Sequence, residues 1–365
     1  MAADDSRIKK IAIVLGTRPE IIKMSPVIRA CEENGIDYFI LHTGQHYSYN
    51  MDRVFFEQLK LREAKYNLDV GSGTHAEQTG KILVGVEKIL MKEKPNVVLV
   101  EGDTNTVLAG ALAAAKVNIR IGHVEAGLRS FDRRMPEEIN RILTDHCSDF
   151  LFAPTEIAKE NLIYEGIPKS KIFITGNTIV DAVFQNLEVA RDNRILNKLN
   201  LKAKNYFLVT AHRQENVDVK GRFEGILRGL KMIAEEFELP IIYPVHPRAR
   251  KMMSHFHLVA DGVSFIDPVD YLSFLNLESN AKLILTDSGG VQEEACILGV
   301  PCVTLRDNTE RPETLEVGSN IIVGTTPEKI LIGVRSMLNK NNSWKNPFGD
   351  GKAGRRIVEI LTRGV

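Results

Sequence analysis

Short apolar runs alternate with helical patterns along the chain. Runs such as Ile11–Leu15 and Leu283–Leu285 are apolar throughout and too short for a helix. Strands without polar alternation are buried on both faces, which is typical of parallel sheets covered by helices. The expected strands of the first half are Ile11–Leu15, Asp37–Thr43, Asn96–Val100, Arg120–Val124, Phe150–Ala153 and Ile172–Thr175.

The same alternation restarts after a charged, helical segment, Leu187–Lys204, which we interpret as the connection between two domains. The expected strands that follow are Tyr206–Thr210, Ile241–Val245, Val263–Ile266, Leu283–Leu285 and Val303–Leu305. The pattern predicts an α/β protein with two Rossmann-like, doubly wound parallel-sheet domains that face a cleft. We expect these domains at residues 1–180 and 181–345. A final helix within residues 346–365 is expected to pack back on the first domain.

Helix boundaries have local signals. Thr74 and Glu77 form a capping-box pattern that predicts a helix running to about Lys94. Pro136 suits the first turn of another helix. Pro26 lies inside a helical pattern, which predicts a kink or a break there.

Composition excludes several classes of protein. The 365 residues include 47 basic and 47 acidic side chains, so no net field attracts nucleic acid or a membrane surface. The four cysteines form no CxxC pair, and no apolar run approaches about 20 residues. His255 and His257 have a spacing that a helix would point apart, and no DxD motif occurs. We therefore expect a cytoplasmic protein without a metal, a nucleic-acid partner or a membrane partner.

The stretch Leu283–Pro301 has the order strand, small-residue turn, helix. Its turn contains Ser288, Gly289 and Gly290, and a helix N-terminus at this point presents unpaired N–H groups to an anion. Glu294, one turn further on, is a candidate acceptor for ribose hydroxyls. An ordinary βα turn explains the turn residues equally well when they are taken alone.

Charged residues recur at the carboxyl ends of the expected strands. They are Arg18, Lys23, Asp103, Glu125, Arg129, Glu137, Glu138, His212, Arg213 and His246. Each alone is more often a solvated loop charge or a helix cap. Together they indicate one ligand site, because ligands bind at this edge of parallel sheets. Several carboxylates with opposing basic groups suit acid–base chemistry on a sugar, and Arg and His suit a departing diphosphate.

Several motifs together resemble the non-hydrolysing UDP-N-acetylglucosamine 2-epimerase family. In the first half they are GTRPEIIK (16–23), EGDT (101–104), GHVEAGLRS (122–130) and PEEINR (136–141). In the second half they are ITGNTIVDA (174–182), TAHRQEN (210–216), YPVHP (243–247), TDSGGVQEEA (286–295) and RDNTERPE (306–313). The resemblance extends from about Lys9 to the C-terminal helix.

This resemblance implies a glycosyltransferase-B-like fold with a UDP-sugar between its domains. The family interconverts UDP-N-acetylglucosamine and UDP-N-acetylmannosamine, usually as a homodimer and without a cofactor or metal. UDP is eliminated as C2 loses its proton, which leaves 2-acetamidoglucal. UDP then adds back while a proton reaches the opposite face of C2. The product supplies N-acetylmannosamine units for surface polysaccharide or glycan synthesis.

The resemblance also assigns residues. The catalytic set is Lys23, Asp103, Glu125, Glu137 and His212, of which Asp103 and Glu137 are candidates for proton transfer at C2. Which of these two acids serves which face stays open. Glu125 positions or polarises the sugar, Lys23 orients carboxylates and His212 stabilises the diphosphate. The UDP-binding set is Arg18, His246, Phe274, Ser288, Gly289, Gly290, Glu294 and Arg311.

Some bacterial members bind a second substrate molecule as an activator. Gln45, Arg213 and His246 match that site. Ser48 stands where a glutamine is common, and Lys81 stands where an arginine is common. Because a lysine cannot reproduce the bidentate fork of arginine, substrate activation through Gln45 and Arg213 stays an open alternative.

Four alternative functions remain open. A hydrolysing 2-epimerase would release free N-acetylmannosamine. A 2-epimerase for oxidised or doubly acetamidated UDP-sugars would be expected to begin its first motif with GARPQ, which differs from Thr17 and Glu20 here. A glycosyltransferase of the same fold needs an acceptor face, and the first domain has no basic run to provide one. A sugar-nucleotide sensor without catalysis would be expected to lack the acids.

Overall fold

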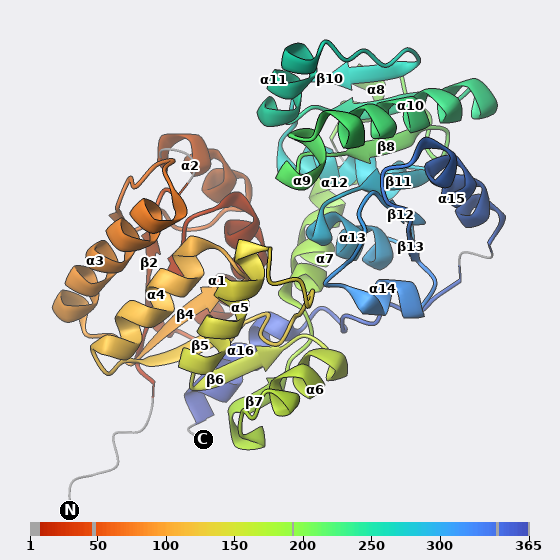
Figure 1. Cartoon of the computed structure of the whole chain (residues 1–365). Coiled ribbons are helices and arrows are strands. Elements are labelled where there is room, and N and C mark those ends of the chain that lie inside the picture. Colours follow the sequence, from red (N-terminus) through yellow and green to blue (C-terminus); the bar gives the residue numbers. More distant parts are fainter. Residues whose placement is uncertain (1–7, 46–48, 192, 341–342, 364–365) are drawn as a thin grey trace, which may run out of the picture. The chain divides into compact units, whose positions relative to one another are not determined.

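The computed structural model describes residues 8–45, 49–191, 193–340 and 343–363 (Figure 1). The chain divides into two compact units, residues 1–184 with 348–365 and residues 185–347. Each unit contains a parallel sheet with helices around it. No helix in the described residues combines the length and the apolar character that a membrane span requires.

The sheet of the first unit has seven parallel strands in the order β3-β2-β1-β4-β5-β6-β7. They are β1 (Lys10–Leu15), β2 (Asp37–His42), β3 (Tyr66–Asn67), β4 (Val97–Glu101), β5 (Arg120–Val124), β6 (Phe150–Ala153) and β7 (Ile172–Ile174). Its helices are α1 (Arg18–Glu33), α2 (Tyr49–Gln58), α3 (His75–Glu93), α4 (Asn105–Lys116), α5 (Pro136–Cys147), α6 (Glu156–Tyr164), the 3₁₀ turn η1 (Lys169–Lys171), the first part of α7 (Thr178–Arg191) and α16 (Ala353–Arg363).

The second unit repeats this plan with six parallel strands in the order β10-β9-β8-β11-β12-β13. They are β8 (Phe207–Thr210), β9 (Ile241–Pro244), β10 (Val263–Ile266), β11 (Leu283–Thr286), β12 (Cys302–Thr304) and β13 (Asn320–Ile322). Its helices are α8 (Ile195–Lys198), α9 (Gln214–Val217), α10 (Lys220–Phe237), α11 (Pro247–Phe256), α12 (Tyr271–Asn280), α13 (Gly289–Ile297), α14 (Pro312–Glu316) and α15 (Pro327–Asn339).

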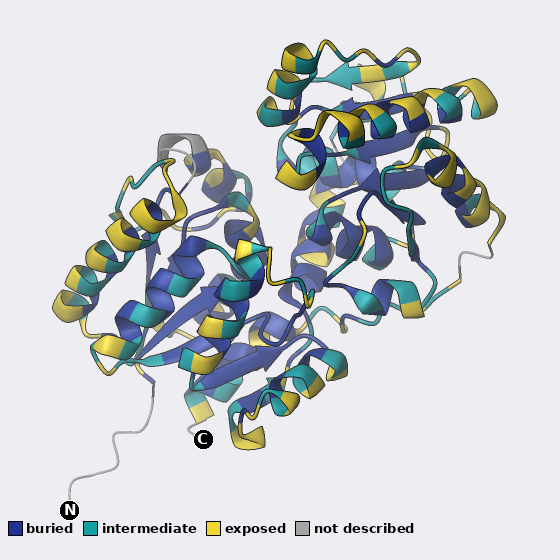
Figure 2. Cartoon of the chain, viewed as in Figure 1, coloured by how far each residue is buried: buried dark blue, intermediate teal, exposed yellow. Residues whose placement is uncertain are grey.

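Both sheets are buried on two faces, which confirms the predicted fold class. Figure 2 shows the central strands as buried and the exposed residues on the outer sides of the helices. In β1, Ala12 and Val14 pack into one core with α3 and α4. Ile11 and Ile13 are also fully buried, and the alternation of a strand turns them to the other face.

The strand order fixes where a ligand site is expected in each unit. The chain leaves β1 toward β2 on one side and returns to β4 on the other, so the order reverses between β1 and β4. The second sheet reverses in the same way between β8 and β11. In doubly wound sheets the crevice for a ligand lies beyond the carboxyl ends of the two strands at this reversal.

Helix α1 runs unbroken through Pro26, so of the predicted kink or break the break does not occur. Proline removes the N–H that would bond to the Ile22 carbonyl four residues earlier. The Ser25 hydroxyl donates to that carbonyl instead, at 2.8 Å. The capping box of Thr74 and Glu77 is present at the start of α3, as predicted.

The segment Leu187–Lys204, which was predicted to be helical, contains two separate helical parts. Helix α7 begins at Thr178 and ends at Arg191, and only the short α8 follows before β8. The Asn276 side chain donates to the carbonyls of Ala190 (2.7 Å) and Asn193 (2.8 Å), and the Asn193 side-chain oxygen accepts the Ile195 N–H. These side-chain bonds replace helical ones, so the chain turns at this point.

Helix α16 lies against α1 in the first unit. Its start is held by Asp181, whose carboxylate accepts the N–H groups of Ala353 (3.1 Å) and Gly354 (3.0 Å). A Cβ on Gly354 would lie 2.7 Å from the carbonyl carbon of Pro26. The glycine therefore permits the close contact between these two helices.

We expect Gly354→Ala to lower the free energy of unfolding by about 1–3 kcal/mol, because the added methyl must separate α16 from rigid backbone. Gly80→Ala is the matched control, since Gly80 lies inside α3 and a methyl group there would meet no neighbouring atom within 4 Å. Alanine at that position should stabilise the protein by up to about 1 kcal/mol through helix propensity. Urea unfolding followed by circular dichroism measures both, and equal stability of the two variants would contradict the packing role.

Candidate functional site

Lys23 and Glu125 form the centre of a buried charged cluster in the first unit. Lys23 is on α1, after β1, and Glu125 directly follows β5. Lys23 Nζ lies 2.6 Å from Glu125 Oε1 and 3.4 Å from Glu101 Oε1. Asn177 Nδ2 donates to the same Glu125 oxygen at 3.0 Å. The sheet therefore gathers two carboxyl groups around one ammonium group at the carboxyl ends of its strands.

The backbone at Glu125 is held in an unfavourable conformation. Its φ is +71°, a left-handed value that costs a non-glycine residue on the order of 1–2 kcal/mol. The turn is fixed by the Ala126 N–H, which donates to Phe152 O, and by the Gly127 N–H, which donates to Asp145 Oδ2, both at 3.2 Å. Such conformations concentrate at functional sites, and here one presents a buried carboxylate.

Glu20 is a third buried carboxyl group in the same region. Its Oε2 accepts the Gly16 N–H and its Oε1 accepts the Thr104 hydroxyl, both at 2.6 Å. These bonds join the turn after β1 to the N-cap of α4. Burial raises the pKa of the Glu20 carboxyl from 4.5 to about 7, although its hydrogen bonds act in the opposite direction. Glu20 was not among the predicted site residues.

Asp103 is held by the helix that follows the next strand. Arg141 of α5 donates to Asp103 Oδ2 from Nε (3.0 Å) and from a terminal nitrogen (2.8 Å). Asn140 of the same helix donates to the Asp103 carbonyl at 2.8 Å. The Asp103 side chain keeps 31% exposure, so its carboxylate is fixed but accessible.

Glu137 and Glu138 open helix α5 and have different environments. Glu138 is buried, pairs with Arg141 at 2.5 Å and accepts the backbone N–H groups of Ser130 (3.0 Å) and Phe131 (2.9 Å). Glu137 is half-buried, and among the described residues no hydrogen bond or ion pair holds its carboxylate. Glu138 therefore stabilises the preceding loop, whereas Glu137 is the accessible acid of the pair.

Arg129 is part of the same supporting structure. It is buried and pairs with Asp145 (2.7 Å) and Glu165 (2.6 Å). Asp145 also contacts His123 Nδ1 at 2.6 Å. The charge of Arg129 is thus neutralised within the unit.

In the second unit, buried Asp287 organises the loop after β8. Its carboxylate accepts the N–H groups of His212 (3.0 and 3.1 Å) and Arg213 (3.0 Å) and the Asn216 amide (3.1 Å). The His212 side chain is 41% exposed. Its ring centroid lies 5.6 Å from that of His246, the N-cap residue of α11. Two imidazoles are thus held side by side at the carboxyl ends of β8 and β9.

The turn before α13 is surrounded by arginines and glutamates. Ser288 caps α13, and a Cβ on Gly289 would lie 2.4 Å from Glu310 Oε1. Glu310 is buried between Arg306 (2.8 Å) and Arg213 (3.2 Å). Glycine is therefore required at position 289 because a side chain there would clash with Glu310. A Cβ on Gly290 would meet only Ser288 Oγ, at 3.9 Å, so the space beside the Gly290 Cα is open.

The remaining predicted UDP-binding residues of this unit have mixed environments. Arg311 is buried, and its Nε lies 2.5 Å from Glu293. Glu294 is nearly buried at 7% exposure in the first turns of α13. Phe274 is half-buried and packs against the core that contains Leu277 and Val291. The structure thus brings Ser288, Gly289, Gly290, Arg311 and Arg213 to one helix N-terminus.

Arg18 and Gln45 make contacts within the first unit. Arg18 Nε lies 3.2 Å from Asp52 and its guanidinium lies over the Phe55 ring. Gln45 is buried, and its Oε1 accepts the Thr106 N–H and hydroxyl at 2.9 and 2.8 Å. Lys81 is exposed on α3, and Ser48 lies outside the described residues. In this conformation the Gln45 side chain is held by hydrogen bonds to the first turn of α4.

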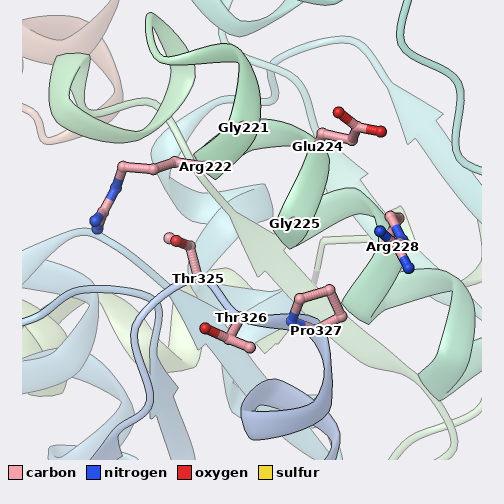
Figure 3. Close-up of a pocket in the computed structure, with 8 residues that line it drawn as sticks. All are labelled: Gly221, Arg222, Glu224, Gly225, Arg228, Thr325, Thr326 and Pro327. Carbon is pink, nitrogen blue, oxygen red and sulfur yellow. The ribbon is translucent and has the colours of Figure 1, made fainter.

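A pocket of about 300 Å³ in the second unit contains none of the predicted site residues (Figure 3). It is lined by Gly221, Arg222, Glu224, Gly225, Arg228, Thr325, Thr326 and Pro327. Arg222 already pairs with Asp307 at 2.9 Å. No group of three or more His, Cys, Asp or Glu side chains within the described ranges is arranged to hold a metal ion.

Sequence reasoning missed five residues that build these sites. They are Glu20, Glu101, Arg141, Asp287 and Glu310. Each lies inside one of the family motifs, close to a predicted site residue. Membership in a motif was therefore the signal that could have identified it. Their partners are mostly distant in the sequence, and no local pattern indicated which neighbour would be buried.

Comparison with known proteins identifies the family. The two parallel sheets have the glycosyltransferase-B-like fold of nucleotide-sugar enzymes. The sequence profile described as UDP-N-acetylglucosamine 2-epimerase matches residues 29–362. The chain therefore belongs to the UDP-N-acetylglucosamine 2-epimerase family, as the resemblance predicted.

Individual relatives agree with this assignment. A UDP-N-acetylglucosamine 2-epimerase from Methanocaldococcus jannaschii is 61% identical over 97% of this chain and 99% of its own length. A crystal structure of the M. jannaschii UDP-GlcNAc 2-epimerase with UDP-GlcNAc and UDP has a TM-score of 0.93 at 61% identity, over 97% of this chain and 100% of that one. A UDP-2,3-diacetamido-2,3-dideoxy-D-glucuronate 2-epimerase from Pseudomonas aeruginosa is 43% identical over 97% of this chain and 99% of its own length.

The raised pKa of Glu20 leads to a pH-dependent stability prediction. The folded state binds the Glu20 proton more tightly than the unfolded state, so Glu20 reduces stability as pH rises from about 4.5 through about 7. Over this pH range, ionisation of Glu20 lowers the free energy of unfolding by on the order of 3 kcal/mol. Glutamine cannot ionise, so we expect the Glu20→Gln variant not to lose this stability as pH rises.

The measurement is the free energy of unfolding of both proteins between pH 4 and 8. Other groups titrate in both, so their effects cancel in the difference between variant and wild type. That difference should move in favour of Glu20→Gln as pH rises. A difference that stays constant would show that Glu20 does not hold its proton more tightly in the folded protein.

Proposed function

We propose that the protein interconverts UDP-N-acetylglucosamine and UDP-N-acetylmannosamine without releasing free sugar. In the first step an acid residue in its ionised form takes the C2 proton, the C1–O bond to the diphosphate breaks and a C1=C2 double bond forms. In the second step a UDP oxygen attacks C1 and a proton is delivered to the opposite face of C2. Atoms and charge balance with UDP as the only leaving and attacking group.

The arrangement around α5 is the observation that carries this proposal. The helix holds Asp103 through Arg141 and Asn140, and it carries the accessible Glu137 in its own first turn. Inversion at C2 requires one group to remove a proton and another to deliver one from the other side. Asp103 and Glu137 are proposed as these two groups, and their assignment to the two faces is left open.

Glu125 and Lys23 have a different proposed role. The Glu125 carboxylate is paired with the Lys23 ammonium at 2.6 Å and accepts a hydrogen bond from Asn177. We propose that it fixes the acetamido sugar by accepting a hydrogen bond. Lys23 orients the carboxyl groups around it. Neither role requires these residues to exchange a proton with the substrate.

The second unit is proposed to bind the UDP portion. His212, His246 and the N-terminus of α13 with Ser288 provide donors for a diphosphate, and charge-assisted bonds stabilise it as it leaves. Arg213 and Arg311 contribute positive charge at the same helix terminus. Glu294 is proposed to accept the ribose hydroxyls, Phe274 to contact the uracil and Arg18 to complete the UDP site.

Proton NMR of the protein with UDP-N-acetylglucosamine in D₂O tests the activity. We expect UDP-N-acetylmannosamine with deuterium at C2 and no accumulating free sugar, because UDP is recaptured. Free N-acetylmannosamine together with UDP would identify a hydrolysing enzyme instead. Absence of both exchange and product would refute the proposal, and UDP-2,3-diacetamido-glucuronate would then be the next substrate to measure, given the 43% identical relative.

A matched pair of variants separates chemistry from binding. Asp103→Asn removes a proposed proton-transfer group and should abolish turnover while UDP affinity stays within about twofold. Glu294→Ala should weaken UDP binding by about 1–3 kcal/mol, since the ribose loses a carboxyl hydrogen-bond acceptor. Calorimetric titration with UDP measures binding, and the NMR assay measures turnover. Normal turnover by Asp103→Asn would remove Asp103 from the mechanism.

We further propose that the enzyme acts as a homodimer and supplies N-acetylmannosamine units for polysaccharide synthesis. Both statements rest on the family resemblance. Light scattering of the purified protein decides the first of them.

A further inference from the structure

Glu101 is a buried carboxyl group that the proposed reaction does not use. It is the last residue of β4, two positions before Asp103, and is 2% exposed. Its Oε1 lies 3.4 Å from Lys23 Nζ, whereas Glu125 Oε1 lies 2.6 Å from the same nitrogen. The ammonium group is therefore closely paired with Glu125 and only loosely paired with Glu101.

Glu101 and Glu125 thus share one buried ammonium group, and Glu101 Oε1 has no hydrogen-bond partner among the described residues. An ionised carboxylate has acceptors and no donor, so two carboxyl groups share a hydrogen bond only when one of them carries a proton. Burial raises the pKa of Glu101 well above its ordinary range; the Lys23 charge opposes this shift, and the charges of Glu125 and Glu20 add to it. One ammonium group balances the charge of one carboxylate, and its looser contact with Glu101 assigns the proton to Glu101.

We infer that Glu101 is a positioning residue that acts as a neutral acid, donates its proton in a hydrogen bond to Glu125 and leaves the Lys23 ammonium to Glu125. The inference rests on the proposed role of Glu125 in holding the sugar. If Glu101 were ionised, two carboxylates would compete for one ammonium, and Glu125 would lose a donor on a backbone that is already strained at φ +71°.

Several charged groups face Glu101 and act on the same equilibrium. On α1 they are Lys23 and Glu20, and after β5 there is Glu125. His123 of β5 contacts the neighbouring Gly102 carbonyl at 2.9 Å, and Arg141 of α5 pairs with Asp103. Loss of the Glu101 proton would add a negative charge to this set, and the pair of Lys23 and Glu125 would be disturbed first.

Two substitutions of similar size test the inference. Glu101→Gln keeps a neutral side chain whose amide can donate to Glu125, so kcat should fall by less than about threefold. Glu101→Met removes the donor, and kcat should fall by about tenfold to a hundredfold. Melting temperature and UDP affinity, which the second unit is proposed to provide, serve as controls for folding. A Gln variant that folds, binds UDP and loses as much activity as Met would overturn the neutral-donor role.

The pH profile distinguishes this role from simple packing. In the wild-type enzyme activity should decline on the alkaline side as Glu101 loses its proton. In Glu101→Gln, which cannot lose it, that decline should move to higher pH. An alkaline limb identical in the two proteins would contradict the inference.

An infrared difference spectrum gives a readout that does not depend on turnover or on the Met variant. The wild-type spectrum minus that of Glu101→Gln, recorded at neutral pH, should contain the C=O stretch of a protonated carboxyl group. A carboxylate band in its place would show that Glu101 is ionised, and the inference would fail. Failure of the proposed epimerisation would be recognised separately, as absence of C2 exchange by the wild-type enzyme.

Discussion

The first unit is organised around a cluster in which two buried carboxyl groups contact one ammonium group and a third lies nearby. Glu20, Glu101 and Glu125 lie at the carboxyl ends of neighbouring strands, and Lys23 is the ammonium that contacts two of them. Ionising all three in a buried setting would be costly, so the cluster retains protons near neutrality. In the proposed reaction this buried cluster positions the sugar, and proton transfer is assigned to the accessible Asp103 and Glu137 beside it.

The second unit has the same sheet topology and the opposite electrostatic character. Its buried acid, Asp287, is satisfied by backbone N–H groups and an amide, and Glu310 is satisfied by two arginines. The carboxylates here are structural: Asp287 holds the backbone of His212 and Arg213, and Glu310 holds the Arg213 side chain. One doubly wound plan thus carries both the site proposed for proton transfer and the site proposed for the diphosphate, depending on which side chains stand after its strands.

The sequence predicts elements whose causes are local. Strand Arg120–Val124, helix start Pro136 and the capping box of Thr74 were all expected, since apolar runs, proline and caps act over a few residues. The break at Pro26 was expected for the same local reason and does not occur, because Ser25 satisfies the freed carbonyl. Site partners are not local: Glu310 and Arg213 are 97 residues apart, and Glu20 meets Thr104 across 84 residues. The motifs therefore marked the region of each site and left its internal pairing undetermined.

Glu137 and Glu138 illustrate the same limit within one helix turn. Adjacent helical residues are separated by about 100°, so one glutamate faces the loop and Arg141 while the other does not. Arg141 is three residues beyond Glu138 and pairs with both Glu138 and Asp103. The buried glutamate therefore holds the arginine that in turn holds Asp103, the proposed catalytic aspartate. The accessible acid Glu137 is consequently carried by α5, and the fixed acid Asp103, which follows β4, is held by two other residues of the same helix. A shift of α5 would move Glu137 and disturb the hydrogen bonds that hold Asp103, so the fold couples the positions of the two proposed proton-transfer groups.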